Sequence, residues 1–173
     1  VEFTHIEPSG AILRYDNEYT NMVRPGISLY GATPFGKPSK DLKPVMEFRA
    51  PIALTKSIPA LTDVGYNRTY TSDRSMQIGL VQGGYADGVP TSFSNQGVVS
   101  YGNNIANIIG RVAFDLTTID ISSLDCRDFD YVTFWGGDNE EVRIENVAMN
   151  CDRNPYELFT GISRRVKRIF IDD

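Results

Sequence analysis

After residue 32 the chain alternates short apolar runs with turns rich in Gly, Asn and Asp. This pattern is typical of the strands of a β-barrel or β-sandwich. Pro51 lies within the first long run and requires a bulge or an edge position there, because proline has no amide hydrogen to donate. The expected strands are residues 46–58, 70–71, 76–81, 97–101, 107–112, 116–121, 131–135 and 141–144. Gly-Gly-Asp-Asn at 136–139 predicts a hairpin turn.

Helical patterns are few. Residues 144–149 follow an apolar run and predict a short helix, and residues 155–163 begin with a proline, which is well tolerated in a first helical turn. The first 31 residues read differently, with an expected strand end at 3–6, a helix at 11–15 and a strand at 27–30. This βαβ rhythm is too short for a domain and indicates the closing unit of a larger one. We therefore expect two parts, residues 1–31 and residues 32–173.

Composition narrows the class of protein. The chain has 173 residues, of which 41% are hydrophobic and 23% are charged, so it can form one domain, or one domain plus a fragment of another. The net charge is -5, and the only basic run, residues 164–168, is interpreted as a solvated strand or tail. A nucleic-acid partner is therefore not expected.

Neither a metal site nor a membrane-spanning segment is expected. Cys126 and Cys151 lack metal-ligand spacing, the single histidine does not complete a zinc site, and both cysteines are expected to be reduced thiols. No apolar run approaches the length of a membrane span, and residues 1–4 do not resemble a signal peptide. The chain does not begin with methionine, and we expect a piece of a longer protein.

Two tyrosine-bearing segments are the strongest candidates for chemistry. Residues 63–70, Asp-Val-Gly-Tyr-Asn-Arg-Thr-Tyr, and residues 84–88, Gly-Tyr-Ala-Asp-Gly, each place a tyrosine where a strand meets a glycine-bearing bend. Such a tyrosine can point its hydroxyl into a cleft. A free phenol has a pKa near 10, so Tyr66 would act as a base only if cations or donors stabilised the phenolate. Asp87 is equally well explained as a turn residue.

With residues 22–31, 110–115 and 154–157, these segments resemble the C-terminal part of alanine racemase, a pyridoxal-phosphate (PLP) enzyme, over residues 5–168. The resemblance implies a mainly β fold. Residues 32–173 would form a Greek-key-like β-barrel, and residues 1–31 would be a βα remnant of a TIM barrel. It also implies a cytoplasmic enzyme that interconverts L- and D-alanine for cell-wall peptidoglycan, acting as a homodimer with shared active sites.

The resemblance assigns a role to each matching residue. Tyr66 would be one of two acid/base groups, because racemisation needs a base on each face of the α-carbon. The guanidinium of Arg24 would donate to the pyridine nitrogen of PLP and leave it unprotonated. The supporting residues behind these groups would be His5 and Asp115. The phosphate would be bound by Ser9, the amides of Gly26 and Ile27, and the hydroxyl of Tyr156. The substrate would meet the amide of Phe114 and the side chain of Tyr85, which lines the entrance.

The family's PLP-lysine lies near the start of a TIM barrel of roughly 200 residues or more. No lysine here matches that motif, so the Schiff-base lysine is expected outside this chain, and the chain alone is expected to be inactive. The lysines considered and not assigned are Lys37, Lys40, Lys43, Lys56 and Lys167.

Three positions depart from the family pattern and bear on substrate preference. Phe114 replaces a usual methionine, Pro8 a usual asparagine, and Thr91 an entrance arginine. One alternative is the racemase domain of a membrane serine/alanine racemase of the vancomycin-resistance type, although the bulk of Tyr156 favours alanine. A basic amino-acid decarboxylase would lack the Gly-Tyr-Ala-Asp-Gly segment. A non-catalytic β-barrel module for binding or dimerisation is the alternative outside the enzymes, and the sequence upstream of Val1 would distinguish it.

Overall fold

The computed structural model describes residues 2–16 and 18–171, and its main body is an antiparallel barrel. The strands lie in the order β8-β7-β10-β3-β6-β9. A single antiparallel bridge between Ile108 and Ile119 joins the two outer strands, so the barrel is nearly closed. The barrel strands are β3 (Phe48–Ile58), β6 (Met76–Val81), β7 (Val98–Tyr101), β8 (Asn104–Asn107), β9 (Thr117–Asp120) and β10 (Tyr131–Trp135). The predicted mainly β, Greek-key-like barrel is confirmed.

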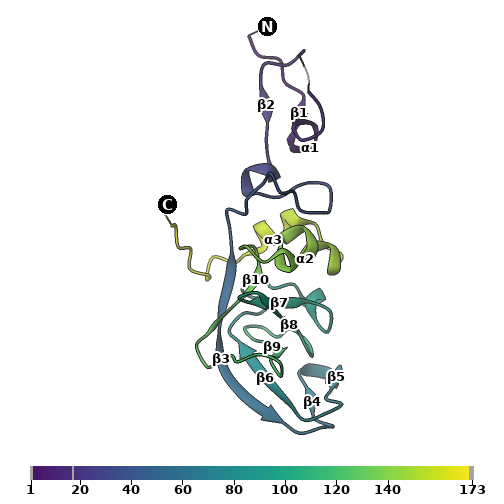
Figure 1. Cartoon of the computed structure of the whole chain (residues 1–173), viewed down its shortest axis with the longest axis vertical. Coiled ribbons are helices and arrows are strands. Elements are labelled where there is room, and N and C mark those ends of the chain that lie inside the picture. The colour runs from purple at the N-terminus through teal and green to yellow at the C-terminus, as the bar shows by residue number, and fades with distance from the viewer. Residues whose placement is uncertain (1, 17, 172–173) are drawn as a thin grey trace.

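Smaller elements flank the barrel at both ends (Figure 1). At the N-terminal end, β1 and β2 pair in parallel, with Glu7 opposite Val23. The remaining elements are β1 (Glu7–Pro8), α1 (Ser9–Ile12), β2 (Val23–Arg24), η1 (Ile27–Tyr30), β4 (Asp63–Val64), η2 (Tyr66–Arg68), β5 (Tyr70–Thr71), η3 (Thr91–Phe93), η4 (Glu140–Val142), α2 (Ile144–Asn150) and α3 (Pro155–Gly161), where η denotes a 3-10 helix.

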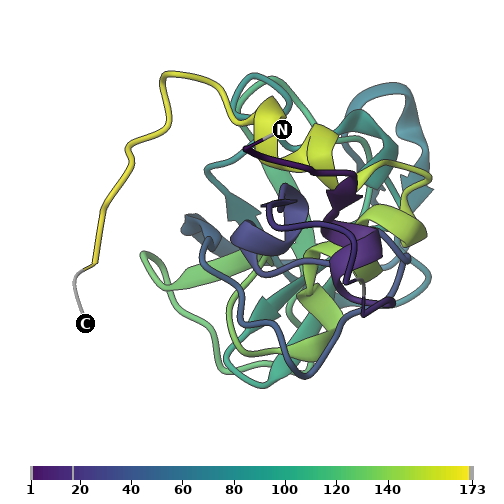
Figure 2. The same cartoon turned by 90° about the horizontal axis from the view of Figure 1, so that it is seen from above.

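Figure 1 shows β1, β2 and α1 at one end of the elongated molecule and β4 and β5 at the other, with α2 and α3 on the side of the barrel that faces the N-terminal elements. Seen along the long axis, the last residues extend away from the body (Figure 2). The two predicted parts, 1–31 and 32–173, include residues 1, 17 and 172–173, which lie outside the described residues. The boundary between the two parts at residue 31 stays a prediction.

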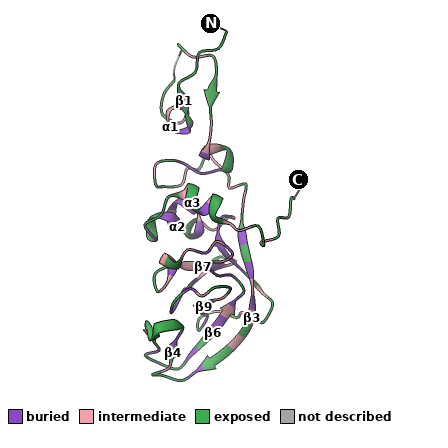
Figure 3. Cartoon of the chain, turned by 180° about the vertical axis from the view of Figure 1, so that it is seen from behind, coloured by how far each residue is buried: buried purple, intermediate pink, exposed green. Residues whose placement is uncertain are grey.

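The long strand β3 pairs with β10 on one side and with β6 on the other. Its first half alternates buried and less buried positions, with Phe48, Ala50 and Ile52 buried, as expected for a strand with one face on a core (Figure 3). The register with β6 shifts between Ile52 and Leu54, next to Pro51. The predicted bulge is therefore present.

Aromatic rings fill the core where β3 meets β10. Phe48 lies 5.5 Å from Phe134 and 4.6 Å from Trp135 between ring centroids, and Phe93 makes an edge contact with Trp135 at 6.4 Å. Phe93, Phe134 and Trp135 are completely buried. This cluster anchors the end of the barrel from which the chain continues toward α2.

Several local predictions were wrong, and at two of them a glycine or a cap is involved. Residues 27–30 form the 3-10 helix η1, which ends at Gly31 with φ of 75°, instead of a strand. The strand expected at 107–112 lies instead at Asn104–Asn107, followed by an isolated bridge at Ile108, and Gly110, with φ of 72°, is not part of a strand. The expected strand 141–144 and the hairpin before it are replaced by η4, because the Asn139 side chain accepts a hydrogen bond from the amide of Glu141. Residues 3–6 are not a strand either; β1 begins at Glu7.

Replacing Phe134 by alanine should lower the free energy of unfolding by about 3–5 kcal/mol, since a fully buried ring is lost from a packed core. Urea unfolding followed by circular dichroism measures the change. The control is Phe170→Ala, because this phenylalanine is 91% exposed and its loss should change stability by less than about 0.5 kcal/mol. Equal unfolding midpoints for the two variants would contradict the assigned core.

Candidate functional site

Four of the sequence-predicted residues form a compact cradle of backbone amides and hydroxyls. The amide of Gly26 donates to Ser9 Oγ at 2.8 Å, and the amide of Ile27 donates to the Tyr156 hydroxyl at 2.7 Å. Ser9 is buried at the start of α1, and it also accepts from the hydroxyl of Ser28 at 3.0 Å. The cradle therefore joins the N-terminal segment to α3, across 129 residues of sequence between Ile27 and Tyr156.

Gly26 and the N-terminal cap of α3 explain why Tyr156 can reach this position. A Cβ atom at Gly26 would lie 2.7 Å from the Tyr156 hydroxyl, so a larger residue would displace it. The Asn154 side chain accepts from the amide of Tyr156 at 2.9 Å, and Pro155 occupies the first turn of α3. An open pocket of about 430 Å3 lies beside the cradle, with Ile27 and Tyr156 in its lining.

Arg24 and His5 lie in the same N-terminal segment but are not bonded to each other. Arg24 ends β2, opposite Pro8 and two residues before Gly26. Both side chains are exposed, and neither has a hydrogen bond or ion pair to another residue of the described chain. An arginine without a partner beside a set of amide donors gives this end of the molecule a free cationic donor.

A second group of predicted residues gathers around the chain from 110 to 115. The rings of Tyr85 and Phe114 make an edge contact, with centroids 5.6 Å apart and planes at 89°. The amide of Tyr85 donates to the carbonyl of Ala113 at 3.0 Å, and the amide of Ala86 donates to that of Phe114 at 2.9 Å. Asp115 follows as an exposed residue. The amide of Phe114 has no acceptor within the described ranges.

Tyr66 approaches the same segment through its preceding glycine. Gly65 has φ of 76°, and a Cβ atom there would lie 3.0 Å from the amide nitrogen of Arg111. The Tyr66 side chain begins η2 and is 70% exposed, and its hydroxyl has no partner in the described structure. The sequence predicted a tyrosine at a glycine-bearing bend with its hydroxyl in a cleft; the bend is present, but within one chain the Tyr66 side chain is exposed.

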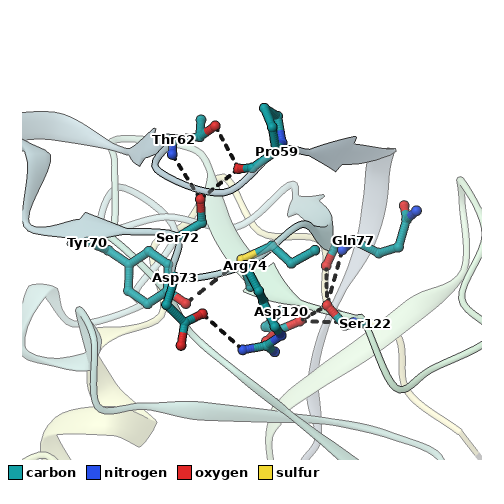
Figure 4. Close-up of polar contacts among 10 residues, drawn as sticks. Pro59, Thr62, Tyr70, Ser72, Asp73, Arg74, Gln77, Asp120 and Ser122 are labelled. Carbon is teal, nitrogen blue, oxygen red and sulfur yellow. Dashed lines mark hydrogen bonds and ion pairs between the residues drawn. The ribbon is translucent and has the colours of Figure 1, made fainter.

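Tyr70, four residues from Tyr66, lies beside a group of charged side chains (Figure 4). Burial raises the pKa of the Tyr70 phenol, and the carboxylates of Asp120 and Asp73 raise that pKa further. Arg74 lies between these carboxylates, 2.9 Å from Asp120 and 3.2 Å from Asp73. The Arg74 guanidinium opposes this effect only in part, so the pKa of Tyr70 stays above that of an ordinary phenol, which makes Tyr70 a poor candidate for a base.

The turn at residues 84–88 is held by an ion pair that the sequence did not predict. Asp87 accepts from the amide of Gly84 at 2.9 Å and contacts Arg165 Nε at 2.9 Å. The Arg165 guanidinium also lies over the ring of Phe114, at 5.4 Å. Asp87 is thus a turn residue, as one of its two interpretations expected. Arg165 is part of this group, whereas the run 164–168 was expected to be simply solvated, and nothing in its local sequence indicates the contact.

Tyr66 and the cradle are not brought together within one chain. The cradle lies between the N-terminal segment and α3, while Tyr66 lies between β4 and β5, at the far end of the molecule in Figure 1. One chain therefore places Tyr66 apart from the cradle, whereas Tyr85 lines a pocket together with Glu157 and Gly161 of α3.

The cysteine thiols and the metal-ligating side chains add no further candidate site among the described residues. Burial raises the pKa of the thiols of Cys126 and Cys151 to about 11, and both cysteines are free. Within residues 2–16 and 18–171, no cluster of three or more His, Cys, Asp or Glu side chains could hold a metal ion. None of the helices in the described part is long and apolar enough to cross a membrane.

Comparison with known proteins gives a consistent result. The family model described as "Alanine racemase, C-terminal domain" matches residues 45–170. An alanine racemase of Vesicomyosocius okutanii is 42% identical over 158 residues, which cover 91% of this chain and 44% of that protein. The chain therefore spans less than half the length of this curated relative.

Solved structures agree with the sequence match. The biosynthetic alanine racemase of Pseudomonas aeruginosa superimposes with a TM-score of 0.90 at 32% identity, over 99% of this chain and 48% of that one. The alanine racemase of Bartonella henselae, with covalently bound pyridoxal phosphate, gives a TM-score of 0.88 at 32% identity, over 98% of this chain and 47% of that one.

Replacing Tyr156 by phenylalanine should remove the acceptor of the Ile27 amide while leaving the ring in place. One net hydrogen bond is worth about 1 kcal/mol, so exchange of this amide with solvent should accelerate roughly fivefold. Hydrogen exchange at Ile27, read by NMR, measures the effect. Tyr66→Phe is the matched control, since its hydroxyl has no described partner. A similar exchange rate at Ile27 in both variants would show that the Tyr156 contact does not hold the cradle.

Proposed function

Because this chain belongs to the alanine racemase C-terminal domain family, we propose that it is the C-terminal part of a PLP-dependent alanine racemase. The observation that carries the proposal is the cradle in which Ser9, Gly26, Ile27 and Tyr156 converge from distant parts of the chain. The whole enzyme would interconvert L- and D-alanine, in the cytoplasm, to supply D-alanine for peptidoglycan. In this proposal residues 1–31 are the end of the barrel that completes the cofactor site.

The residues present fit the phosphate of PLP. Phosphate oxygens accept hydrogen bonds, and the cradle brings two backbone amides and two hydroxyls together around a glycine without a side chain. Here the amides donate to the two hydroxyls, whose own protons stay available, and the amides would exchange these acceptors for phosphate oxygens when the phosphate binds. Ser9, Gly26, Ile27 and Tyr156 would hold the phosphate. The Schiff-base lysine would come from outside this chain. The cofactor, when bound, supplies an electron sink for the charge left at the substrate α-carbon.

Arg24 would hold the cofactor ring at its nitrogen. Its side chain is exposed and free of described partners, so it can donate without breaking an existing contact. A guanidinium does not release its proton, and the nitrogen that it faces therefore stays unprotonated. A weaker electron sink shortens the life of the charged α-carbon and limits side reactions. His5, in the same segment, would support the arginine from behind.

Tyr66 would move the proton at its hydroxyl oxygen. It would take the α-proton from one face of the substrate, and a base outside this chain would serve the opposite face. The amide of Phe114 would bind the substrate carboxylate, which its lack of a described acceptor supports. Asp115 would support this segment. Tyr85, packed edge-on against Phe114, would confine the substrate at the entrance and restrict its size.

The separation of Tyr66 from the cradle supports a homodimer with shared active sites. Since Tyr66 lies between β4 and β5, at the end of the molecule away from the N-terminal segment that carries the cradle, a complete site would need Tyr66 from one subunit beside the cofactor held by another. The bulk of Tyr156 at the cradle favours alanine over serine as the substrate.

The chain by itself should not racemise alanine when PLP is added, because the lysine and most of the barrel lie elsewhere. The measurement is turnover of L-alanine to D-alanine together with the visible absorbance band of bound cofactor. Measurable turnover with a stable band would show that a lysine of this chain had been overlooked.

Replacing Tyr66 by phenylalanine in the full-length enzyme should reduce racemisation about 10²–10⁴-fold, the usual contribution of a general acid–base group. Net turnover must fall in both directions, since the equilibrium between enantiomers is unchanged. Exchange of the α-deuteron should separate the two bases: it should be lost from L-alanine and persist in D-alanine, which the other base serves.

The matched control for this experiment is Tyr131→Phe, because Tyr131 is also exposed but lies on β10. It should leave exchange from both enantiomers unchanged. Near-normal exchange from both enantiomers in the Tyr66 variant would remove this residue from the mechanism.

A further inference from the structure

We infer that Glu145 and Arg143, at the start of α2, are positioning residues that hold the phosphate cradle at its place on the barrel domain. The inference rests on the proposed function, because it assigns these residues to the segment that would bind the cofactor phosphate. Neither residue belongs to the cradle itself, and neither was a candidate from the sequence.

Glu145 makes a buried contact with the chain that leaves the cradle. Its side chain is 1% exposed, and Oε1 accepts a hydrogen bond from the amide of Thr33 at 2.8 Å, with Thr33 itself 2% exposed. The other oxygen, Oε2, is buried and has no partner among the described residues. A buried carboxylate with an unmet oxygen costs stability. Proteins leave buried polar atoms without a partner chiefly at functional sites. The Glu145 carboxylate is therefore better explained by its role in positioning Thr33 than by a contribution to stability.

Arg143 also contacts the loop of residues 31–42, which Glu145 contacts through Thr33. Its Nη2 donates to the carbonyl of Gly31 at 3.0 Å and to that of Leu42 at 3.2 Å, and so joins the two ends of the loop. Gly31 permits this closure, because a Cβ atom there would lie 1.8 Å from the carbonyl oxygen of Lys43. Only glycine fits at position 31, because its backbone packs directly against the backbone of Lys43.

Only one short element separates the clamp from the cradle. The 3-10 helix η1 runs from Ile27 to Tyr30, so Gly26 and Ile27 lie at one end of it and Gly31 at the other. The ring of Tyr30 also lies 5.5 Å from that of Phe159 on α3. A rigid helical turn transmits the position of Gly31 and Thr33 to the amides of Gly26 and Ile27. Displacing the clamp should therefore move the amide donors relative to the Tyr156 hydroxyl.

The test compares PLP with pyridoxal, which lacks the phosphate, as ligands of the full-length protein stripped of cofactor. Glu145→Ala should weaken PLP binding roughly tenfold or more, the loss expected for a hydrogen bond to a charged group, and should leave pyridoxal binding nearly unchanged. Glu145→Gln keeps an acceptor for the Thr33 amide and should restore PLP binding. Glu141→Ala is the matched control, because this glutamate is exposed and only four residues away.

Equal losses for PLP and pyridoxal, or unchanged PLP affinity in a folded Glu145→Ala protein, would overturn the inference. If that variant fails to fold, Arg143→Met tests the same clamp from the other end of the loop and should show the same phosphate-specific loss; unchanged PLP affinity there would also overturn it. Failure of the parental protein to bind PLP would instead overturn the proposed function, so the two failures are distinguishable.

Discussion

The structure depends on one long strand that must pair on both sides and still bend. β3 pairs with β10 through its first half and with β6 through its second, and the register shift beside Pro51 lets it turn between the two partners. Phe48 on this strand packs against Phe134 and Trp135, so the bend and the aromatic core lie together. From that core the chain continues into α2 and α3, and side chains of these helices contact the N-terminal segment. Loss of the bulge would therefore displace the helices as well as the sheet.

A small number of polar contacts connects the barrel to the N-terminal segment. Tyr156 accepts from Ile27, Glu145 accepts from Thr33, and Arg143 donates to Gly31 and Leu42. Except for the contact to Leu42, they fall on η1 or within three residues of its end, which is consistent with a segment whose position matters more than its own stability. Each contact links residues more than 100 positions apart. The geometry of the cradle therefore depends on contacts from the barrel domain as well as on the residues that line it.

The proposed catalytic tyrosine lies in a different physical setting from the cradle. Tyr66 is exposed on a short loop held by Gly65 against Arg111, and burial and two carboxylates raise the pKa of the neighbouring Tyr70. An exposed phenol at the far end of the molecule gains a defined environment only when another surface covers it. This is the physical reason why we propose a dimer, in which Tyr66 of one subunit would complete the cradle of another.

The sequence by itself determined the elements whose pattern is local. The strands at 76–81 and 131–135 and the helix that begins at Pro155 are where apolar runs, turn residues and a first-turn proline predict them. It also indicated, through the resemblance, which residues meet at the cradle. Tertiary structure alone decided that residues 27–30 form a 3-10 helix, and that Glu145, Arg143 and Arg165 contact segments far away in the chain. Their partners are backbone groups and side chains distant in sequence, and no local pattern encodes such contacts.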